Sequence, residues 1–236
     1  RFGIFGDGKE LAQIAMAKVF NNGDFRAGYY RDQVFMTAIG QSSPKHMFTA
    51  LYGDPEIERE PSSGSRQMMN HFGTRFLNDD GSWKNLMEQQ NSTSDMACLA
   101  SQFPRLVGLA QASKVYRNNK VLAKSKPKFT DNGTEIAFAT IGNSSCAEGH
   151  FFEAVNAIGV LQVPAIISIW DDGYGISVSN EYQVTKSDIS EIIKGFQRDD
   201  KGEGFELFKV KGWDYPSLIE AYEKAEKLAR DKHIPS

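Results

Sequence analysis

Length, composition and charge describe an ordinary globular chain: 236 residues, 40% of them hydrophobic and 24% charged, with a formal net charge of −3. This charge excludes the basic excess typical of proteins that bind nucleic acid or anionic membrane surfaces, and no apolar run approaches the ~20 residues of a membrane helix. The two cysteines, Cys98 and Cys146, lie far apart and outside any metal-binding spacing, so we expect free thiols and a cytoplasmic protein.

Helical patterns and polar loops alternate in the first half of the chain. Apolar positions at roughly helical spacing predict a helix over residues 9–20, which the turn sequence NNGD ends. SPKHMFTALYG, residues 43–53, predicts a short helix with Ser43 as its N-cap. Residues 54–67 have the composition of an exposed loop, and residues 101–119 predict a longer helix with a proline near its start.

The second half alternates strand-like and helix-like segments. The expected strands are 135–142, 163–170 and 205–212. The expected helices are 147–162, 187–196 and 215–231, of which the second begins at Ser187. Because strand–helix units in series form a parallel sheet with right-handed crossovers, we predict an α/β fold in which helices flank a parallel sheet. We expect one domain over residues 1–236, as part of a longer chain.

Two short strings near the start, GDG and NN, form a diphosphate-and-metal signature in some enzymes. Here they lie around Asp7 and at Asn21–Asn22, and only 15 residues separate Asp7 from Asn22. The predicted helix fills that gap and holds its ends ~20 Å apart at 1.5 Å per residue. We therefore expect a helix start and a helix stop here, and no shared ion-binding site.

A second pair of polar residues, Asn143 and Asp172, follows two consecutive expected strands. One complete strand–helix–strand unit of 29 residues separates them, so both side chains emerge at the carboxyl edge of the sheet, where open α/β sheets bind ligands. An amide oxygen, a carboxylate oxygen and a main-chain carbonyl near Gly173–Tyr174, for which Tyr174 is the candidate, are three oxygen ligands for Mg²⁺. Small residues in GNSSCA and the start of the next helix favour the approach of a diphosphate.

At these residues the chain resembles the alpha subunit of thiamine-diphosphate-dependent 2-oxo acid dehydrogenases of the pyruvate and branched-chain type. The usual family pattern reads GDGATSEG, a helix, a strand and NNGYAIS, whereas this chain has GNSSCAEG and DDGYGIS at the same spacing. The resemblance extends to GYYRDQ, SSGSRQMMNHFG and LASQFPRLVGLAQASK, and so covers nearly the whole chain.

Acid and amide have traded places relative to the family pattern. Asn143 stands where the family has an acid, and Asp172 where it has its second asparagine. The double exchange keeps one carboxylate and one amide, so we predict that the metal site is retained. Alternation along a strand should turn Asp171 away from Asp172, and a basic residue elsewhere is a candidate partner for it.

The resemblance implies that Tyr30 and Arg31 bind the terminal phosphate of the cofactor, a role that suits the guanidinium fork. The alternative for Arg31 is a surface ion pair with Asp32. The resemblance also implies that Leu99 props the thiamine in its bent conformation, although a plain core leucine would look the same in sequence.

Further roles follow from the resemblance around the first loop. Gly142, Ser144 and Ser145 would contact the diphosphate, whereas Glu148, in the first turn of a helix, is expected to be structural. His71 would face the active-site channel or serve as a structural histidine, and no other catalytic residue is assigned.

The resemblance implies an oxidoreductase that decarboxylates a 2-oxo acid with thiamine diphosphate and Mg²⁺ and passes the acyl group to a lipoyl arm of an acyltransferase core. The implied partner is a beta subunit or a fused beta half, in a dimer or heterotetramer. Two alternatives stay open: another thiamine-diphosphate enzyme of the acetoin dehydrogenase or transketolase type, and a non-catalytic scaffold subunit.

Overall fold

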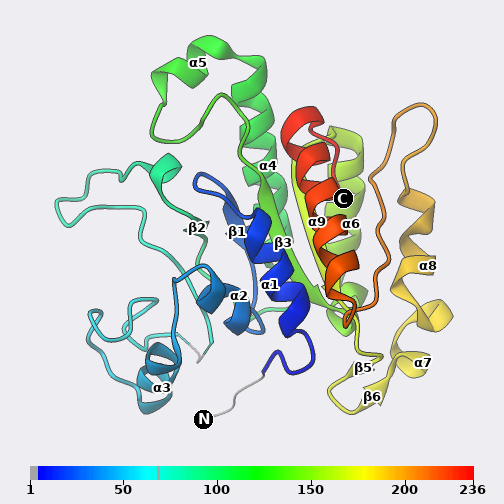
Figure 1. Cartoon of the computed structure of the whole chain (residues 1–236), viewed down its shortest axis with the longest axis horizontal. Coiled ribbons are helices and arrows are strands. Elements are labelled where there is room, and N and C mark those ends of the chain that lie inside the picture. The colour runs from blue at the N-terminus through cyan, green and yellow to red at the C-terminus, as the bar shows by residue number, and fades with distance from the viewer. Residues whose placement is uncertain (1–4, 68–69) are drawn as a thin grey trace.

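A four-stranded parallel sheet forms the centre of the computed structural model, which describes residues 5–67 and 70–236 (Figure 1). The strand order is β2-β1-β3-β4, and every pairing is parallel. The strands are β1 (Phe25–Ala27), β2 (Asn91–Ser92), β3 (Ala137–Gly142) and β4 (Ala165–Trp170). The predicted α/β class is confirmed.

The register between the central strands β3 and β4 determines where their carboxyl ends lie. β3 and β4 pair over six residues, from Ala137 opposite Ala165 to Gly142 opposite Trp170. The helix α6 (Gly149–Leu161) connects them, as expected for a strand–helix–strand unit. Both strands therefore end at the same level, and the residues that follow them leave the sheet side by side.

Helices cover both faces of the sheet, and alternate residues of β3 face two separate cores. One core contains Ala137, Ala139 and Ile141 of β3 and packs against α4 (Gln102–Asn118) and α6. The other contains Phe138 and packs against helices that Figure 1 shows in front of the sheet. These helices are α1 (Glu10–Val19), α2 (Gln33–Ala38) and α9 (Tyr215–Lys232).

Shorter elements surround these layers. The remaining α-helices are α3 (Pro44–Tyr52), α5 (Lys120–Ser125), α7 (Asn180–Gln183) and α8 (Ile189–Ile193). The 3₁₀ helices are η1 (Leu86–Glu88), η2 (Asn143–Ala147), η3 (Thr185–Ser187) and η4 (Lys194–Phe196). β5 (Tyr174–Gly175) and β6 (Val178–Ser179) form a small antiparallel hairpin. No helix in the described part of the chain has the length and apolarity needed to cross a membrane.

Most of the elements expected from the sequence are present. The helices expected over 9–20, 43–53, 101–119, 147–162 and 215–231 correspond to α1, α3, α4, α6 and α9. The Ser43 hydroxyl accepts the main-chain N–H of His46, which confirms it as the N-cap of α3. Residues 54–67 contain neither helix nor strand, in agreement with the predicted loop.

The helix expected over 187–196 begins at a different residue. The carboxylate of Asp188, not Ser187, caps α8 by accepting the N–H of Ser190 at 2.8 Å. Ser187 instead closes the preceding turn η3 with a positive φ of 55°, a conformation that removes it from the helix. The helix then tightens into η4 rather than continuing as one α-helix.

The prediction of a strand over residues 205–212 is wrong, because the structure describes these residues and assigns no strand to them. Only Phe205 forms a β-bridge, with Gln197. The edge of β4 is taken by Ser236, whose carbonyl accepts the N–H of Ile167 at 2.8 Å and whose own N–H bonds to Ala165 at 3.0 Å. An alternating sequence forms a strand only when another backbone lies beside it, and here residues 235–236 lie between β4 and the expected strand.

Candidate functional site

The functional edge lies where β3 and β4 end, and the main chain of Tyr174 joins its two sides. The Asn143 amide nitrogen donates to the Tyr174 carbonyl at 3.1 Å, and the Tyr174 N–H donates to Asp172 Oδ1, also at 3.1 Å. Asn143 and Asp172 therefore both contact the main chain of the third candidate ligand, Tyr174, Asn143 through its amide nitrogen and Asp172 through Oδ1. The register of β3 and β4 explains this arrangement, because it ends both strands at one level.

Asn180, a residue that the sequence did not single out, connects Asn143 to Asp171. Its side chain is 5% exposed, accepts from Asn143 Nδ2 at 2.6 Å and donates to Asp171 Oδ1 at 3.1 Å. Asp171 also accepts the N–H of Gly173. Its partners are thus amide groups and not the basic residue considered from the sequence. Both bonds of Asn143 use Nδ2, so neither occupies its carbonyl oxygen Oδ1.

Asp172 has the basic partner instead. The ammonium of Lys9 lies 2.7 Å from Asp172 Oδ2, and the two side chains are 13% and 43% exposed. Burial acts to raise the pKa of Asp172, but hydrogen bonds from Lys9 and from the N–H of Tyr174, with the charge of nearby Arg31, outweigh it and hold the pKa below its ordinary value. Asp172 is therefore an ionised carboxylate with cations on its open side.

Lys9 is an unusual residue for the start of a helix. It is the N-cap of α1 but forms no side-chain capping bond there. A capping side chain contributes ~1 kcal/mol and a cation at the positive end of a helix dipole costs ~0.3–1 kcal/mol, whereas a partly exposed ion pair contributes only ~0–1 kcal/mol. The pair with Asp172 does not, by stability alone, favour lysine at this position.

Arg31 is half-buried and lies over the end of β3. Its guanidinium carbon lies 5.8 Å from the ring centre of Tyr29 and 5.6 Å from that of Tyr30, and its Nη1 donates to the Tyr29 hydroxyl at 3.4 Å. A Cβ atom on Gly142 would lie 2.5 Å from Nη1, so the glycine leaves the space that this guanidinium occupies. The proposed phosphate ligand is thereby held at the candidate diphosphate loop.

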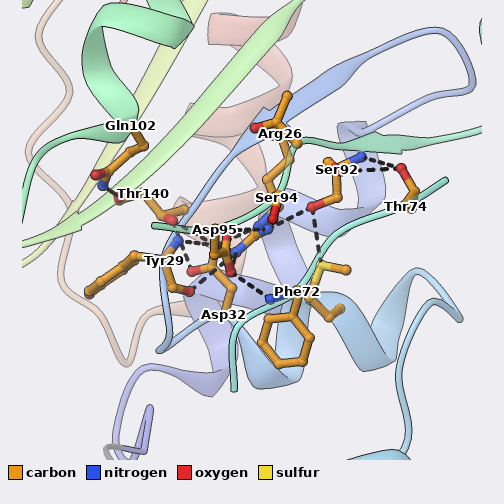
Figure 2. A network of polar contacts seen from close by, with 12 residues as sticks. Arg26, Tyr29, Asp32, Phe72, Thr74, Ser92, Ser94, Asp95, Gln102 and Thr140 are labelled. Atoms are coloured by element: carbon orange, nitrogen blue, oxygen red, sulfur yellow. Dashed lines mark hydrogen bonds and ion pairs between the residues drawn. The ribbon is translucent and has the colours of Figure 1, made fainter. Parts of the chain in front are cut away.

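The alternative of a surface ion pair between Arg31 and Asp32 is excluded, because Asp32 is completely buried and pairs with Arg26 (Figure 2). Arg26 Nε donates to Asp32 Oδ2 at 2.6 Å, and its two terminal nitrogens donate to the two oxygens of Asp95, both at 3.0 Å. All three side chains of this cluster, which we call the Arg26 cluster, are fully enclosed. Burial raises the pKa of Asp32 to about 6, although Arg26 acts to lower it.

The Arg26 cluster fixes the segments that carry the predicted cofactor ligands. Asp32 accepts the N–H of Tyr29, while Arg26 donates to the Tyr29 carbonyl, so the turn before Tyr30 and Arg31 is anchored at both ends. On the other side Asp95 accepts the N–H of Phe72, next to His71. A Cβ atom at Gly28 would come within 2.1 Å of both Arg26 and Asp32, so this turn requires glycine.

Leu99 and His71 occupy different environments. Leu99 is 44% exposed, so it is not a leucine of the core of this chain. His71 is 6% exposed, and its ring centre lies 6.2 Å from that of Tyr30. It therefore lies beside a predicted cofactor ligand. Met68 and Met69, in the same resembling stretch, lie outside the described residues.

The loop after β3 offers small groups in close packing. The Ser144 hydroxyl is buried without a hydrogen-bond partner among the described residues, and it lies 2.0 Å from where a Cβ on Gly175 would be. Ser145 is 6% exposed and its carbonyl accepts the N–H of Glu148, which precedes α6 as its N-cap. The hydroxyl of Ser144, in the loop that begins after Gly142, is thus a buried donor with no partner in the described part of the chain, and an anionic oxygen ligand would satisfy it.

A divalent cation bound at this edge of the sheet would have one carboxylate ligand, Asp172. Within residues 5–67 and 70–236, no group of three or more His, Cys, Asp or Glu side chains could hold a metal ion. The candidate donor set is Asp172, whose Oδ2 is paired with Lys9, the Asn143 amide oxygen and the Tyr174 carbonyl, which accepts from Asn143 Nδ2. Three protein oxygens would leave positions for phosphate oxygens. This set fits Mg²⁺, which is usually held by one or two carboxylates and the phosphates of its ligand.

The GDG and NN strings lie at opposite ends of α1, as predicted. Ten residues of helix separate them, a rise of about 15 Å. Lys9 lies at the Asp172 end, whereas Asn22 lines a polar cavity that also contains Arg230. The two strings cannot share an ion.

Comparison with known proteins agrees with this geometry. The model of the family described as "Dehydrogenase E1 component" matches residues 1–236. The chain belongs to this family. The 2-oxoisovalerate dehydrogenase subunit alpha of Bacillus subtilis (strain 168) is 27% identical over 236 residues, which are 100% of this chain and 60% of the relative. The pyruvate dehydrogenase E1 component subunit alpha of Acholeplasma laidlawii is 26% identical over 231 residues, 97% of this chain and 52% of the relative.

A plant relative gives the same match. The chloroplastic pyruvate dehydrogenase E1 component subunit alpha-3 of Oryza sativa subsp. japonica is 24% identical over 232 residues, 98% of this chain and 47% of the relative. The chain thus spans about half the length of the curated E1 relatives it matches. The predicted resemblance to the alpha subunit of 2-oxo acid dehydrogenases is confirmed.

Proposed function

We propose that this chain is the part of a 2-oxo acid dehydrogenase E1 component that binds the diphosphate of thiamine diphosphate with Mg²⁺. The observation that carries the proposal is that Asn143, which follows β3, and Asp172, which follows β4, both form hydrogen bonds with the main chain of Tyr174. The printed names of the relatives, a 2-oxoisovalerate and a pyruvate dehydrogenase alpha subunit, support a 2-oxo acid as the substrate class.

Each residue has a separate task in this proposal. Arg31 and Tyr30 bind the terminal phosphate, and Gly142, Ser144 and Ser145 line the space for the diphosphate. Asn143, Asp172 and Tyr174 would hold Mg²⁺, which would offset part of the diphosphate charge. When bound, thiamine diphosphate supplies the electron sink that makes loss of CO₂ from a 2-oxo acid possible.

The protein's own contribution is binding and orientation. The Arg26 cluster holds the turn that carries Tyr30 and Arg31 against β3, so the main chain that carries both phosphate ligands is fixed before a phosphate arrives. Leu99 would support the thiamine half in its bent conformation, and His71 lies next to Tyr30 at the side of the site. No catalytic proton transfer is assigned to this chain.

The proposed partners follow from the E1 alpha family. A beta subunit or a fused beta half would complete the cleft around the cofactor, and a lipoyl-bearing acyltransferase core would accept the acyl group. We propose a dimer or heterotetramer for the complete enzyme.

The test uses the full-length protein with its beta part. Calorimetry with thiamine diphosphate should show binding that depends on Mg²⁺, and the assembled enzyme should transfer acyl groups from 2-oxoisovalerate or pyruvate to a lipoylated domain. The absence of both a binding heat and a thermal shift with the cofactor would favour the scaffold alternative. Binding followed by transfer to a sugar acceptor would favour a transketolase-type enzyme.

A further inference from the structure

Lys9 lies beside the proposed metal ligand Asp172 but has no task in the proposed function. Lys9 is the N-cap of α1. A lysine side chain has no acceptor with which to cap a helix, and its positive charge is unfavourable at the positive end of the helix dipole. When a residue breaks a local rule in this way, a functional reason is the first hypothesis. The neighbour of the Lys9 ammonium supplies one.

The ammonium of Lys9 occupies the open side of the Asp172 carboxylate. Asp172 Oδ1 accepts the N–H of Tyr174, and Oδ2 lies 2.7 Å from Lys9 Nζ, so both oxygens have partners. A divalent cation that binds Asp172 comes close to this ammonium, and the like charges repel each other. Lys9 is on a flexible four-carbon stem and can move away, whereas Asn143 and the Tyr174 carbonyl are held by hydrogen bonds.

The charges of the site indicate where the ammonium goes. A diphosphate bound with Mg²⁺ brings more negative charge than one divalent cation neutralises. Among the cations already described at this edge, Arg31 lies against Gly142 and Lys9 against Asp172, and the charges of both act on Asp172. A released ammonium next to Asp172 therefore has the arriving phosphate oxygens as its nearest new counter-charge.

We propose that Lys9 is an exchangeable counter-ion of the diphosphate site: it pairs with Asp172 while no divalent cation is bound, and it pairs with the diphosphate once the cation has taken the carboxylate. This inference rests on the proposed function and assigns a ligand to it that lies outside both strand-end loops. It makes two predictions of opposite sign for the same substitution. Without cofactor Lys9 competes with the metal, and with cofactor it adds to binding.

The experiment measures both effects in the full-length protein with its beta part. Mn²⁺ alone, titrated by electron paramagnetic resonance, should bind Lys9→Met about three- to tenfold more tightly than the wild type, because a neighbouring positive charge has been removed. At saturating Mg²⁺, calorimetry should show thiamine diphosphate binding to Lys9→Met about tenfold more weakly, because one charged contact is lost. Lys9→Arg should stay within about threefold of the wild type in both measurements, since it keeps the positive charge.

Lys18→Met is the matched control, because Lys18 is an exposed lysine in the last turn of the same helix and should change neither affinity. If Lys9→Met fails to fold, Lys9→Gln replaces it. Unchanged or weaker Mn²⁺ binding, or unchanged or tighter cofactor binding, would each overturn the inference. A wild type that binds no thiamine diphosphate would overturn the proposed function itself and the inference with it, whereas a normal wild type with an unaffected Lys9→Met overturns the inference alone.

Discussion

The hydroxyl of Thr140 donates to the carboxylate of Asp32, with Oγ1 2.8 Å from Oδ1 and 2.7 Å from Oδ2. Both side chains have no solvent exposure, and Thr140 belongs to β3. The bond therefore attaches the turn with Tyr30 and Arg31 to the central strand. Replacing Thr140 by valine keeps the shape and removes the donor, so we expect a loss of roughly 1–3 kcal/mol in the free energy of unfolding.

Urea unfolding measures this loss, and Thr140→Ser is the control, because serine keeps the hydroxyl and removes only a methyl group. The Thr140→Ser variant should have a clearly higher free energy of unfolding than the Thr140→Val variant. A valine variant that is as stable as the serine variant would show that the bond to Asp32 does not hold the turn.

Removing the cation of the Arg26 cluster should be more damaging. Arg26→Met leaves two carboxylates, Asp32 and Asp95, enclosed without their positive partner, and breaking a buried pair in this way costs ~3–5 kcal/mol. Thermal unfolding should be measured for Arg26→Met and Arg31→Met, and the fall in melting temperature from the wild type compared between them. The half-buried Arg31 has no such enclosed partner, so its loss should change stability far less, and similar shifts for both variants would contradict this account.

Gly142 gives a substitution that should affect ligand binding more than folding. In Gly142→Ala the new Cβ would lie 2.5 Å from Nη1 of Arg31, the far end of a flexible side chain that can move aside. We expect nearly unchanged stability and a loss of about tenfold or more in affinity for thiamine diphosphate with Mg²⁺, because the phosphate contact is displaced. Gly149→Ala is the matched control, since a Cβ there meets nothing within 4 Å. Calorimetry should separate the two variants.

The choice between the two acidic loops is directly testable. Asp172→Ala should abolish the Mg²⁺-dependent binding of thiamine diphosphate, because it removes the single carboxylate of the proposed donor set. Asp7→Ala should leave binding nearly unchanged, since Asp7 lies in the turn before α1 and the length of the helix separates it from Asn22. Equal effects in a calorimetric titration would show that the wrong loop was assigned.

Asp32 should contribute to stability in a pH-dependent way. Burial raises its pKa to about 6 in the folded protein, whereas an unfolded chain has an aspartate pKa of ~3.9. Between these values the folded state binds the additional proton, so the contribution of Asp32 to folding is fully present below pH ~3.9 and declines as the pH rises to about 6. Carbon-13 NMR of the Asp32 carboxyl should give a midpoint near 6, and a midpoint at or below 4 would contradict the prediction.

The sequence predicted those parts of the fold that local patterns determine. The apolar runs of β3 and β4 and the helical spacing of α6 identify their elements, and the spacing of Asn143 and Asp172 places both at one edge. β1 and β2 were not predicted, because they have three and two residues and contain buried polar groups such as Arg26 and Asn91. No period or apolar run indicates such strands.

The site residues that the sequence did not predict contact partners far away along the chain. Lys9 and Asp172 are 163 residues apart, and Arg26 meets Asp95 across 69 residues. Asn180 lies in an ordinary polar stretch, and only the fold places it between Asn143 and Asp171. The lysine at the start of α1, in a position where lysine is unfavourable, was the one signal in the sequence that pointed to such a contact.

The enclosure of Arg26 between Asp32 and Asp95 also restricts how related sequences can diverge at these positions. A neutral residue in place of Arg26 would leave two buried carboxylates without a cation. The loss of either aspartate would remove one of the two carboxylate partners of the guanidinium. Viable lineages should therefore exchange all three together or none. In an alignment of close homologues, columns 26, 32 and 95 should covary as a single unit, independently of the residues that bind the substrate.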